Sequence, residues 1–301
     1  MKIVISGGTG FIGSYLSRML VGSGYEVIVL SRSSRASKIS GITNVKWDTD
    51  NISGWSEHIN GCKAVINLAG DNIASGRWSD SKKKSILESR IASGKALERA
   101  VLEVETPPEV FIQASAIGFY GALGADPVTE VSSAGSNFLA EVCQKWENSS
   151  LEVEKKGIRR VIIRTGMVLG NGGALAKMLP PFKLGLGGAI GDGHQGVSWI
   201  HIDDEIGAIK YLIENDQCKG VFNLTAPSPV TFNRFAKSIG AVLGKPVFMR
   251  VPSFMMKIMM GQMAQEVILS GQFVLPEKLI AVEYPFEYVD VEAALRDIII
   301  N

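Results

Sequence analysis

The spacing of apolar positions changes twice within the first thirty residues. Residues 2–5 form a short apolar run that is mostly β-branched, which is typical of a buried strand. From Phe11 to Leu20 the apolar positions recur at helical spacing, and residues 27–30 form a second apolar run. The pattern therefore predicts a strand, a helix and a second strand, which together make a βαβ unit.

The same two spacings continue along the chain and predict an α/β fold. Apolar runs predict further strands at 45–48, 64–70, 110–115, 161–166 and 199–202. Amphipathic stretches predict helices at 79–102, 138–155, 205–214, 232–243 and 288–300, with Asp203 capping the third of these. Residues 178–182 and 185–193 are rich in Pro and Gly, so we expect a long irregular segment there. Alternating strands and helices favour a Rossmann-type, doubly wound parallel sheet.

A change of composition near Pro227 predicts a second, smaller module. We expect residues 1–226 to form the Rossmann domain, including a loop at about 171–198 beside a substrate cleft, and residues 227–301 to form a C-terminal α/β cap. Pro252 opens a helix in which Met255, Met259 and Met263 share one face. Such a stripe indicates adaptable core packing, and the alternative is a lid over the cleft.

Composition and charge narrow the functional classes. The chain has 301 residues, 46% of them hydrophobic and 20% charged, with a formal net charge of +1. Near-neutral charge gives no general electrostatic reason to expect a nucleic acid or a membrane as partner. The three cysteines and three histidines are scattered, so we expect no metal site and no disulfide framework. The chain begins with a strand and has no apolar run of membrane-spanning length, so we expect a cytoplasmic protein.

Three glycines, Gly7, Gly10 and Gly13, lie where the first strand turns into the first helix. A pyrophosphate binds to free backbone N–H groups at such a helix N-terminus, where the helix dipole also favours negative charge. A β-carbon at Gly7 or Gly10 would hold the backbone away from the phosphate, and one at Gly13 would separate helix from strand. A turn without ligand is the alternative, but the βαβ context favours a dinucleotide.

The end of the second strand indicates which dinucleotide is bound. Units that bind NAD usually place a carboxylate there, whereas this chain has Ser31 and Arg32. A guanidinium suits the 2′-phosphate of NADP, so we predict NADP as the cofactor, with Arg32 favoured and Arg35 less so. The alternative is a solvated basic loop. Small residues at Ala69 and Gly70 would let the cofactor approach the end of the fourth strand closely.

Two further positions at strand ends carry candidate chemistry. Asp48 follows the third strand and is equally consistent with a contact to adenine and with a simple turn. Ser115 ends the fifth strand and is a candidate for the reacting centre. Arg90 lies in the middle of a helix, where the sequence alone favours a surface position.

Four motifs carry a resemblance to a known family. They are Gly7-Gly8-Thr9-Gly10-Phe11-Ile12-Gly13, Asn67-Leu68-Ala69-Gly70, Ala114-Ser115-Ala116-Ile117-Gly118-Phe119-Tyr120-Gly121 and Arg164-Thr165-Gly166-Met167-Val168-Leu169-Gly170. In this order they resemble the extended short-chain dehydrogenase/reductases, in particular the subgroup of epimerase-family, nucleoside-diphosphate-sugar epimerase-like proteins. Residues 178–182 and 198–204 and the module from Asn223 onward also resemble that subgroup, so the resemblance covers the whole chain.

The resemblance implies a domain that binds NADP and a cap that closes over a substrate cleft. Carried over by position, the residues that line the cofactor would be Gly7, Thr9, Gly10, Phe11, Ile12, Gly13, Ser31, Arg32, Leu68, Ala69, Gly70 and Val168. The subgroup also has a cofactor-contacting arginine where this chain has Arg90.

The chain departs from the wider family at the catalytic positions. Active members use a tyrosine as acid–base, with a lysine four residues later that lowers the tyrosine pKa. The helix that should carry this pair, near 138–143, has no tyrosine, and Tyr120 is followed four residues on by Gly124. Ser115 lies close to the expected serine, although its register against Ala116 is open by one residue. Ser115 and Tyr120 are therefore the catalytic candidates, and His201 is a further possible acid.

Two functions are consistent with this pattern. The first is an NADP-dependent oxidoreductase or epimerase-like enzyme of unidentified substrate, for which a sugar nucleotide is one candidate. The alternative is an NADP-binding protein with little or no turnover, which works as a redox sensor or binds a partner. An intact cofactor motif without the Tyr–Lys pair is what the alternative predicts.

Overall fold

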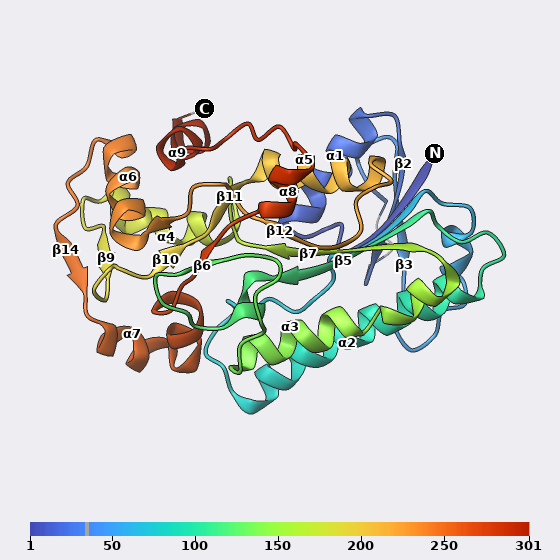
Figure 1. The fold of residues 1–301 in the computed structure, drawn as a ribbon, viewed down its shortest axis with the longest axis horizontal. Helices are drawn as coiled ribbons and strands as arrows, with labels where there is room; N and C mark the ends of the chain where they lie inside the picture. The colour runs from blue at the N-terminus through green and yellow to red at the C-terminus, as the bar shows by residue number, and fades with distance from the viewer. Residues whose placement is uncertain (34–35, 301) are drawn as a thin grey trace.

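A seven-stranded sheet crosses the middle of the molecule in the computed structural model, which describes residues 1–33 and 36–300 (Figure 1). All its neighbouring strands are parallel. In spatial order they are β12 (Gly220–Leu224), β7 (Arg159–Thr165), β5 (Val110–Ala116), β4 (Ala64–Asn67), β1 (Lys2–Ser6), β2 (Glu26–Ser31) and β3 (Ile42–Lys46). The strand order reverses between β1 and β4. This confirms the doubly wound sheet expected from the sequence.

Helices cover both faces of the sheet because both faces of its strands are apolar. Helices α1 (Phe11–Gly22) and α5 (Ile202–Glu214) pack on one face, and α2 (Asp80–Glu103) and α3 (Phe138–Asn148) pack on the other (Figure 1). Ile5 of β1 belongs to the core on the first face, and Val4 belongs to the core on the second. Because side chains alternate along a strand, one strand contributes residues to both cores.

A second group of elements forms the cap at the left of Figure 1. Its helices are α4 (Gly173–Lys183), α6 (Phe232–Leu243), α7 (Ser253–Met260) and α9 (Val291–Ile300), whereas α8 (Glu277–Ala281) packs beside β12 on the sheet. Its short strands pair as β8 (Met167–Leu169) with β11 (Trp199–His201), β9 (Gly188–Ile190) with β14 (Met249–Val251), β10 (Gly196–Val197) with β13 (Val230–Thr231), and β15 (Phe273–Val274) with β6 (Pro127–Val128). A separate core joins α4, α6 and α9, and it includes Trp199 and Phe235.

The segment expected to be irregular contains a helix and short strands instead. Helix α4 continues through Pro180 and Pro181, which lack the N–H groups that the helix would use. Leu175 and Phe182 are buried in the cap core, and this packing offsets the missing hydrogen bonds. The prediction of an irregular segment at 178–182 was therefore wrong.

Two smaller expectations are also corrected. Helix α5 begins at Ile202, and its N-cap is His201, whose Nδ1 accepts a hydrogen bond from the N–H of Asp203. The methionine stripe does not act as one unit, because Met263 is buried whereas Met255 and Met259 are exposed. The core interpretation thus holds for only one of the three residues.

Two observations bear on the environment of the chain. Within residues 1–33 and 36–300, no helix combines the length and the apolar character needed to cross a membrane. Cys62, Cys143 and Cys218 are free thiols and all are buried.

Candidate cofactor site

The glycine turn lies where the strand order of the sheet reverses. Gly7 follows β1 with φ +75°, and a β-carbon there would lie 2.7 Å from the backbone of Leu68, at the end of β4. Only glycine fits this position, because the conformation is left-handed and the neighbouring backbone is so close. The carboxyl ends of β1 and β4 therefore meet at the point where sheets of this type bind nucleotides.

Gly10 faces open space at the start of α1. An added β-carbon would meet only the carbonyl oxygen of Gly7, at 3.2 Å, among the atoms that the structure describes. Gly10 is also the N-cap of α1, and no side chain within residues 1–33 and 36–300 caps this helix. The first N–H groups of α1 are thus available to an anion. Thr9 beside them is exposed.

Gly13 and Phe11 fix the position of the turn. A β-carbon at Gly13 would lie 2.4 Å from the oxygen of Gly7, so Gly13 lets the helix pack against the turn. The ring of Phe11 lies against Gly170 and Gly172, in the loop that follows β8, and against Gly173, the first residue of α4. Other predicted contact residues are partly or fully buried around this turn: Ile12, Leu68 and Ala69 partly, and Val168 fully.

The end of β2 has the polar groups expected from the sequence. Ser31 is buried, and its hydroxyl donates a hydrogen bond to the carbonyl of Ser33. The side chain of Arg32 is exposed, where it is accessible to a ligand at the carboxyl end of the sheet. Arg35 lies outside the described residues. Asp48 accepts a hydrogen bond from the N–H of Asp50, which is a turn interaction.

Arg90 lies at the same edge of the sheet rather than on the outer surface. Its Nη1 donates to the carbonyl oxygens of Asp71 and Ile86, both at 3.0 Å, and its guanidinium lies 4.8 Å from the ring centroid of Trp146. A β-carbon at Gly70 would lie 3.0 Å from Cζ of Arg90. Burial lowers the pKa of Arg90 from its ordinary value. Arg90 is thus held beside Gly70, at the end of β4.

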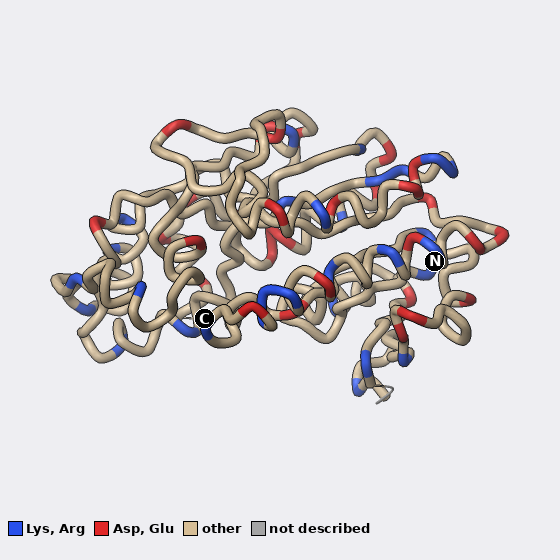
Figure 2. The backbone as a smooth tube through the Cα atoms, turned by 90° about the horizontal axis from the view of Figure 1, so that it is seen from below, with Lys and Arg blue, Asp and Glu red and all other residues tan. Residues whose placement is uncertain are grey.

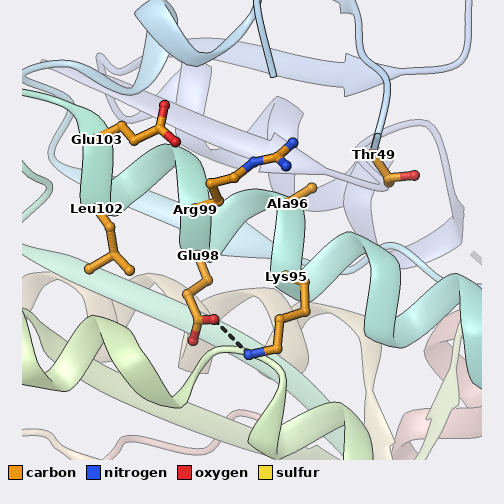
Figure 3. A pocket seen from close by; sticks show the side chains of 7 residues that line it. All are labelled: Thr49, Lys95, Ala96, Glu98, Arg99, Leu102 and Glu103. Atoms are coloured by element: carbon orange, nitrogen blue, oxygen red, sulfur yellow. Dashed lines mark hydrogen bonds and ion pairs between the residues drawn. The ribbon is translucent and has the colours of Figure 1, made fainter. Parts of the chain in front are cut away.

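A hollow on the other side of α2 is a second place to consider. It has a volume of about 460 Å³ and lies between α2 and the loop that follows β3 (Figure 3). Lys95 and Glu98 in its wall form an ion pair of 2.8 Å with each other, and Oε2 of Glu98 accepts from the N–H of Glu152. These groups satisfy one another, so the open turn at the sheet edge is the candidate site for a cofactor.

A buried chain of hydrogen bonds takes up both catalytic candidates. Ser115 donates to Oε1 of Glu147 at 2.7 Å, and Arg164 holds both oxygens of Glu147 at 2.9 and 3.0 Å. Arg164 also donates to the hydroxyl of Tyr120 at 3.1 Å, and this hydroxyl donates to Asn223 at 2.6 Å. Burial raises the pKa of Tyr120 against the opposing influence of Arg164. The chain links β5, α3, β7 and β12.

This network answers the question of register at Ser115. Ser115 and Arg164 are partners in neighbouring strands, and both point to the face covered by α3. Ala116 and Thr165 are the next pair, and Thr165 points to the opposite face, where it contacts α5. Ser115 is 4% exposed and Tyr120 is 1% exposed, so their hydroxyls bind protein groups instead of facing a substrate.

We therefore predict structural effects for substitutions in this network. Ser115→Ala and Tyr120→Phe should each lower the free energy of unfolding by about 1–3 kcal/mol, because a buried charged or polar partner loses a hydrogen bond. Their NADPH affinity should match that of the unchanged protein. Urea unfolding and cofactor titration would test both statements, with the exposed Ser81→Ala as control. A loss of NADPH affinity without a loss of stability would contradict this assignment.

The start of α3 is apolar where active relatives are expected to carry a tyrosine and a lysine. Phe138, Leu139 and Val142 pack in a cluster with Trp78 of the Rossmann part and with Met263 of the cap. The N–H of Leu139 donates to Glu266 at 3.0 Å, so the cap is tied directly to this helix. Packing replaces proton-transfer groups at this end of α3.

Glu205 is a charged residue that the sequence analysis did not select. It is fully buried on α5, Thr165 donates to its Oε1 at 2.8 Å, and its Oε2 has no hydrogen-bond partner within residues 1–33 and 36–300. Burial raises its pKa to about 8. Thr165 ends β7 and is partly exposed, so a protonatable group lies directly behind the edge of the sheet. The sequence contained one sign of this, because Glu205 occupies the helix face that carries Ile202 and Ile209.

His201 serves the packing between α5 and the C-terminal region. Its ring stacks on Tyr288 with centroids 3.9 Å apart, and Nε2 lies 3.4 Å from a carboxylate oxygen of Asp297. Burial lowers its pKa. As the N-cap of α5 and a neighbour of α9, His201 has a structural role in this arrangement.

Comparison with known proteins agrees with this geometry. Residues 3–225 match the model of the NAD dependent epimerase/dehydratase family. The chain belongs to this family. Residues 251–298 match a second model, a domain of unknown function named DUF1731. The resemblance that the motifs indicated is thus confirmed.

Several relatives match this member of the family over their whole length. Epimerase family protein YfhF of Bacillus subtilis is 38% identical over 99% of this chain and 98% of its own. Human epimerase family protein SDR39U1 is 34% identical over 99% of this chain and 100% of its own. The crystal structure of the human protein (isoform2) with NADPH superposes with a TM-score of 0.91 at 33% identity and covers 100% of both chains. UDP-glucose 4-epimerase of Thermus thermophilus with NAD reaches a TM-score of 0.78 at 19% identity, which shows a shared fold.

Proposed function

We propose that this member of the epimerase family binds NADP(H) at the glycine turn. The carrying observation is the open, uncapped start of α1 at Gly10, in a turn whose Gly7 packs against the end of β4 where the strand order reverses. Arg32 at the end of β2 would hold the 2′-phosphate, and Arg90 and Thr9 would contact the pyrophosphate or the ribose beside it. The NADPH in the crystal structure of the human relative supports this choice.

The expected cofactor preference gives a direct test. NADPH should bind more tightly than NADH, and Arg32→Ala should weaken NADPH binding by about 1.5–3 kcal/mol, because a charge-assisted contact to the 2′-phosphate is lost. The variant should leave NADH affinity unchanged, since NADH has no phosphate at that position. Fluorescence titration of both cofactors measures this, and Arg18→Ala on the outer side of α1 is a matched control. Equal affinities for the two cofactors in the unchanged protein would refute the proposal.

We further propose that the protein has little turnover of the type usual for sugar-nucleotide epimerases. Hydride transfer at a carbinol carbon needs a group that moves the hydroxyl proton. Ser115 and Tyr120 are committed to a buried network, and α3 begins with Phe138 and Leu139. Low turnover is consistent with a redox sensor or a partner-binding protein. The three buried free thiols are consistent with a reducing compartment such as the cytoplasm.

One observation supports an oxidoreductase as the second candidate. Thr165 and Glu205 place a hydroxyl and a buried carboxyl with raised pKa at the edge of the sheet. In that case Thr165 would face the substrate, and Glu205 would hold the proton behind it.

Assay of the purified protein separates these two functions. We expect no appreciable NADP reduction, NADPH oxidation or epimerisation across a panel of sugar nucleotides, alcohols and carbonyl compounds. Robust turnover that Thr165→Val abolishes would support the second candidate. Robust turnover that Ser115→Ala or Tyr120→Phe abolishes, in protein of unchanged stability, would restore those residues as the catalytic groups.

A further inference from the structure

One end of the cap presents a large apolar surface. No residue of α7 is buried, and the strand before it, β14, is exposed along most of its length. Six large side chains here are between 41% and 72% exposed: Phe248, Met249, Phe254, Met255, Ile258 and Met259. Leu184 and Leu186 lie just before β9, the strand that pairs with β14, and are 75% and 55% exposed. We call residues 183–186, 248–250 and 254–259 the cap face.

The sequence around the cap face is poor in acidic residues, with Asp192 and Glu266 the nearest along the chain. The sequence has no Asp or Glu from Gln217 to Gln265 and none from Lys155 to Gly191. Five exposed cations lie on or beside the cap face: Lys183, Lys237, Lys245, Arg250 and Lys257. None of them pairs with a carboxylate among residues 1–33 and 36–300. Figure 2 shows several Lys and Arg positions along this left end of the backbone, together with fewer Asp and Glu positions.

Two of these cations share a hollow with an aromatic ring. Lys237 and Arg250 line a space of about 110 Å³ together with Phe248 and Met249. Arginine offers a planar fork of donors that matches a phosphate, and lysine adds a second positive charge. The hollow thus combines donors for a phosphate with apolar groups at its rim.

We propose that the cap face docks on the surface of a membrane that contains anionic phospholipids. The outward side chains of α7, Phe254 and Ile258 among them, enter the boundary between head groups and acyl chains, as amphipathic interfacial helices do. Lys237 and Arg250 bind lipid phosphates, and Lys257 lies close to the anionic surface. The expectation of no membrane contact rested on the net charge of +1 for the whole chain. That sum does not reflect the cations gathered at the cap face.

The charge pattern favours a membrane over a second copy of this chain. A two-fold symmetric dimer through the cap face would place the same surface opposite itself. Its five exposed cations, which form no ion pair within residues 1–33 and 36–300, would then face one another, which opposes association. An anionic lipid surface complements the cations and also covers the apolar side chains.

Sedimentation with vesicles tests the proposal on the full chain. At low salt the protein should pellet with vesicles of equal parts phosphatidylcholine and phosphatidylserine, and stay in solution with phosphatidylcholine alone. Added salt should release it. Phe254→Glu with Ile258→Glu should reduce the pelleted fraction by about tenfold or more, and Lys237→Glu with Arg250→Glu should do the same. Val131→Glu with Val289→Glu, two exposed positions outside the cap face, is the charge-matched control for the Phe254 and Ile258 variant.

Three results would overturn the proposal. They are failure of the unchanged protein to pellet with phosphatidylserine vesicles, equal pelleting with both vesicle types, and full binding by either cap-face variant. A dimer in lipid-free solution that the Ile258→Glu change dissociates would assign the cap face to a second copy. NADPH titration of every variant reports separately on the Rossmann part, so loss of membrane binding is distinguishable from failure of the proposed cofactor function.

Discussion

Replacement of Gly10 by valine should abolish NADPH binding and leave the fold intact. The open space in front of Gly10 is where a pyrophosphate would reach the first N–H groups of α1, and an isopropyl group would fill it. We expect the dissociation constant to rise by at least about 100-fold, or roughly 2.7 kcal/mol. The backbone at Gly10 is extended, with φ −77°, so valine is tolerated there at a cost of about 1 kcal/mol for a poorer N-cap.

Two other glycines of the same helix serve as controls for this experiment. Gly22, at the end of α1, has open space around it. Gly22→Ala should therefore leave NADPH affinity unchanged and should not lower stability. Gly13→Ala should lower stability instead, since its β-carbon would lie 2.4 Å from the oxygen of Gly7. Thermal unfolding and fluorescence titration of the three variants distinguish a glycine needed for cofactor binding from one needed for packing. Tight NADPH binding by folded Gly10→Val protein would show that the turn does not hold the cofactor.

The sequence predicted the parts of the fold that depend on local periodicity. The parallel strands are continuous apolar runs because both faces of the sheet are covered. Gly7 could be recognised from the glycine pattern between strand and helix, and the structure adds that its backbone is left-handed. Helix α4 was missed because two adjacent prolines normally end a helix. Its stability comes from Phe182 and Leu175 in the cap core, which are contacts between distant segments.

The interior polar groups were harder to predict, for a physical reason. Ser115 was correctly placed at the end of a strand, but a strand pattern does not tell which neighbouring group accepts the hydrogen bond of its hydroxyl. The partner, Glu147, is a carboxylate on the buried face of α3, opposite Arg164 of β7. Such a pair is fixed by packing between elements, so it does not follow from the spacing within either one. Glu147 and Glu205 share one sign that is visible in the sequence, an acidic residue on the apolar face of a helix.

Glu205 should make the stability of the protein fall as the pH rises. Its carboxyl group has a pKa of about 8 in the folded protein, because burial penalises the charged form, against an ordinary value of 4.5 in the unfolded chain. Between these values the folded state binds a proton that the unfolded state has lost. The contribution of Glu205 to the free energy of unfolding is therefore fully present below pH 4.5. It decreases as the pH rises from 4.5 to 8, and above pH 8 it has been lost.

The expected size of this effect makes it measurable over the background of other carboxyl groups. Between pH 5 and pH 8 Glu205 alone should lower the free energy of unfolding by roughly 3 kcal/mol. Glu205→Gln cannot ionise, so the difference in stability between this variant and the unchanged protein should shift in favour of the variant by that amount over the same range. Urea unfolding at a series of pH values measures the difference.

Glu214 on the same helix provides the matched control, because the sign of its contribution is opposite. Hydrogen bonds from Lys210 and Tyr25 outweigh burial and lower the pKa of Glu214, so its ionised form stabilises the fold. Glu214→Gln should therefore lose stability relative to the unchanged protein as the pH rises through the acidic range, where Glu205→Gln gains. The two variants differ in one feature that decides the direction. Glu214 reaches solvent and cations, whereas the one hydrogen bond of the Glu205 carboxyl group within residues 1–33 and 36–300 comes from Thr165. If the pH profiles of Glu205→Gln and the unchanged protein run parallel, the carboxyl group is ionised in the folded state. The proton behind Thr165, and with it the second candidate function, would then be excluded.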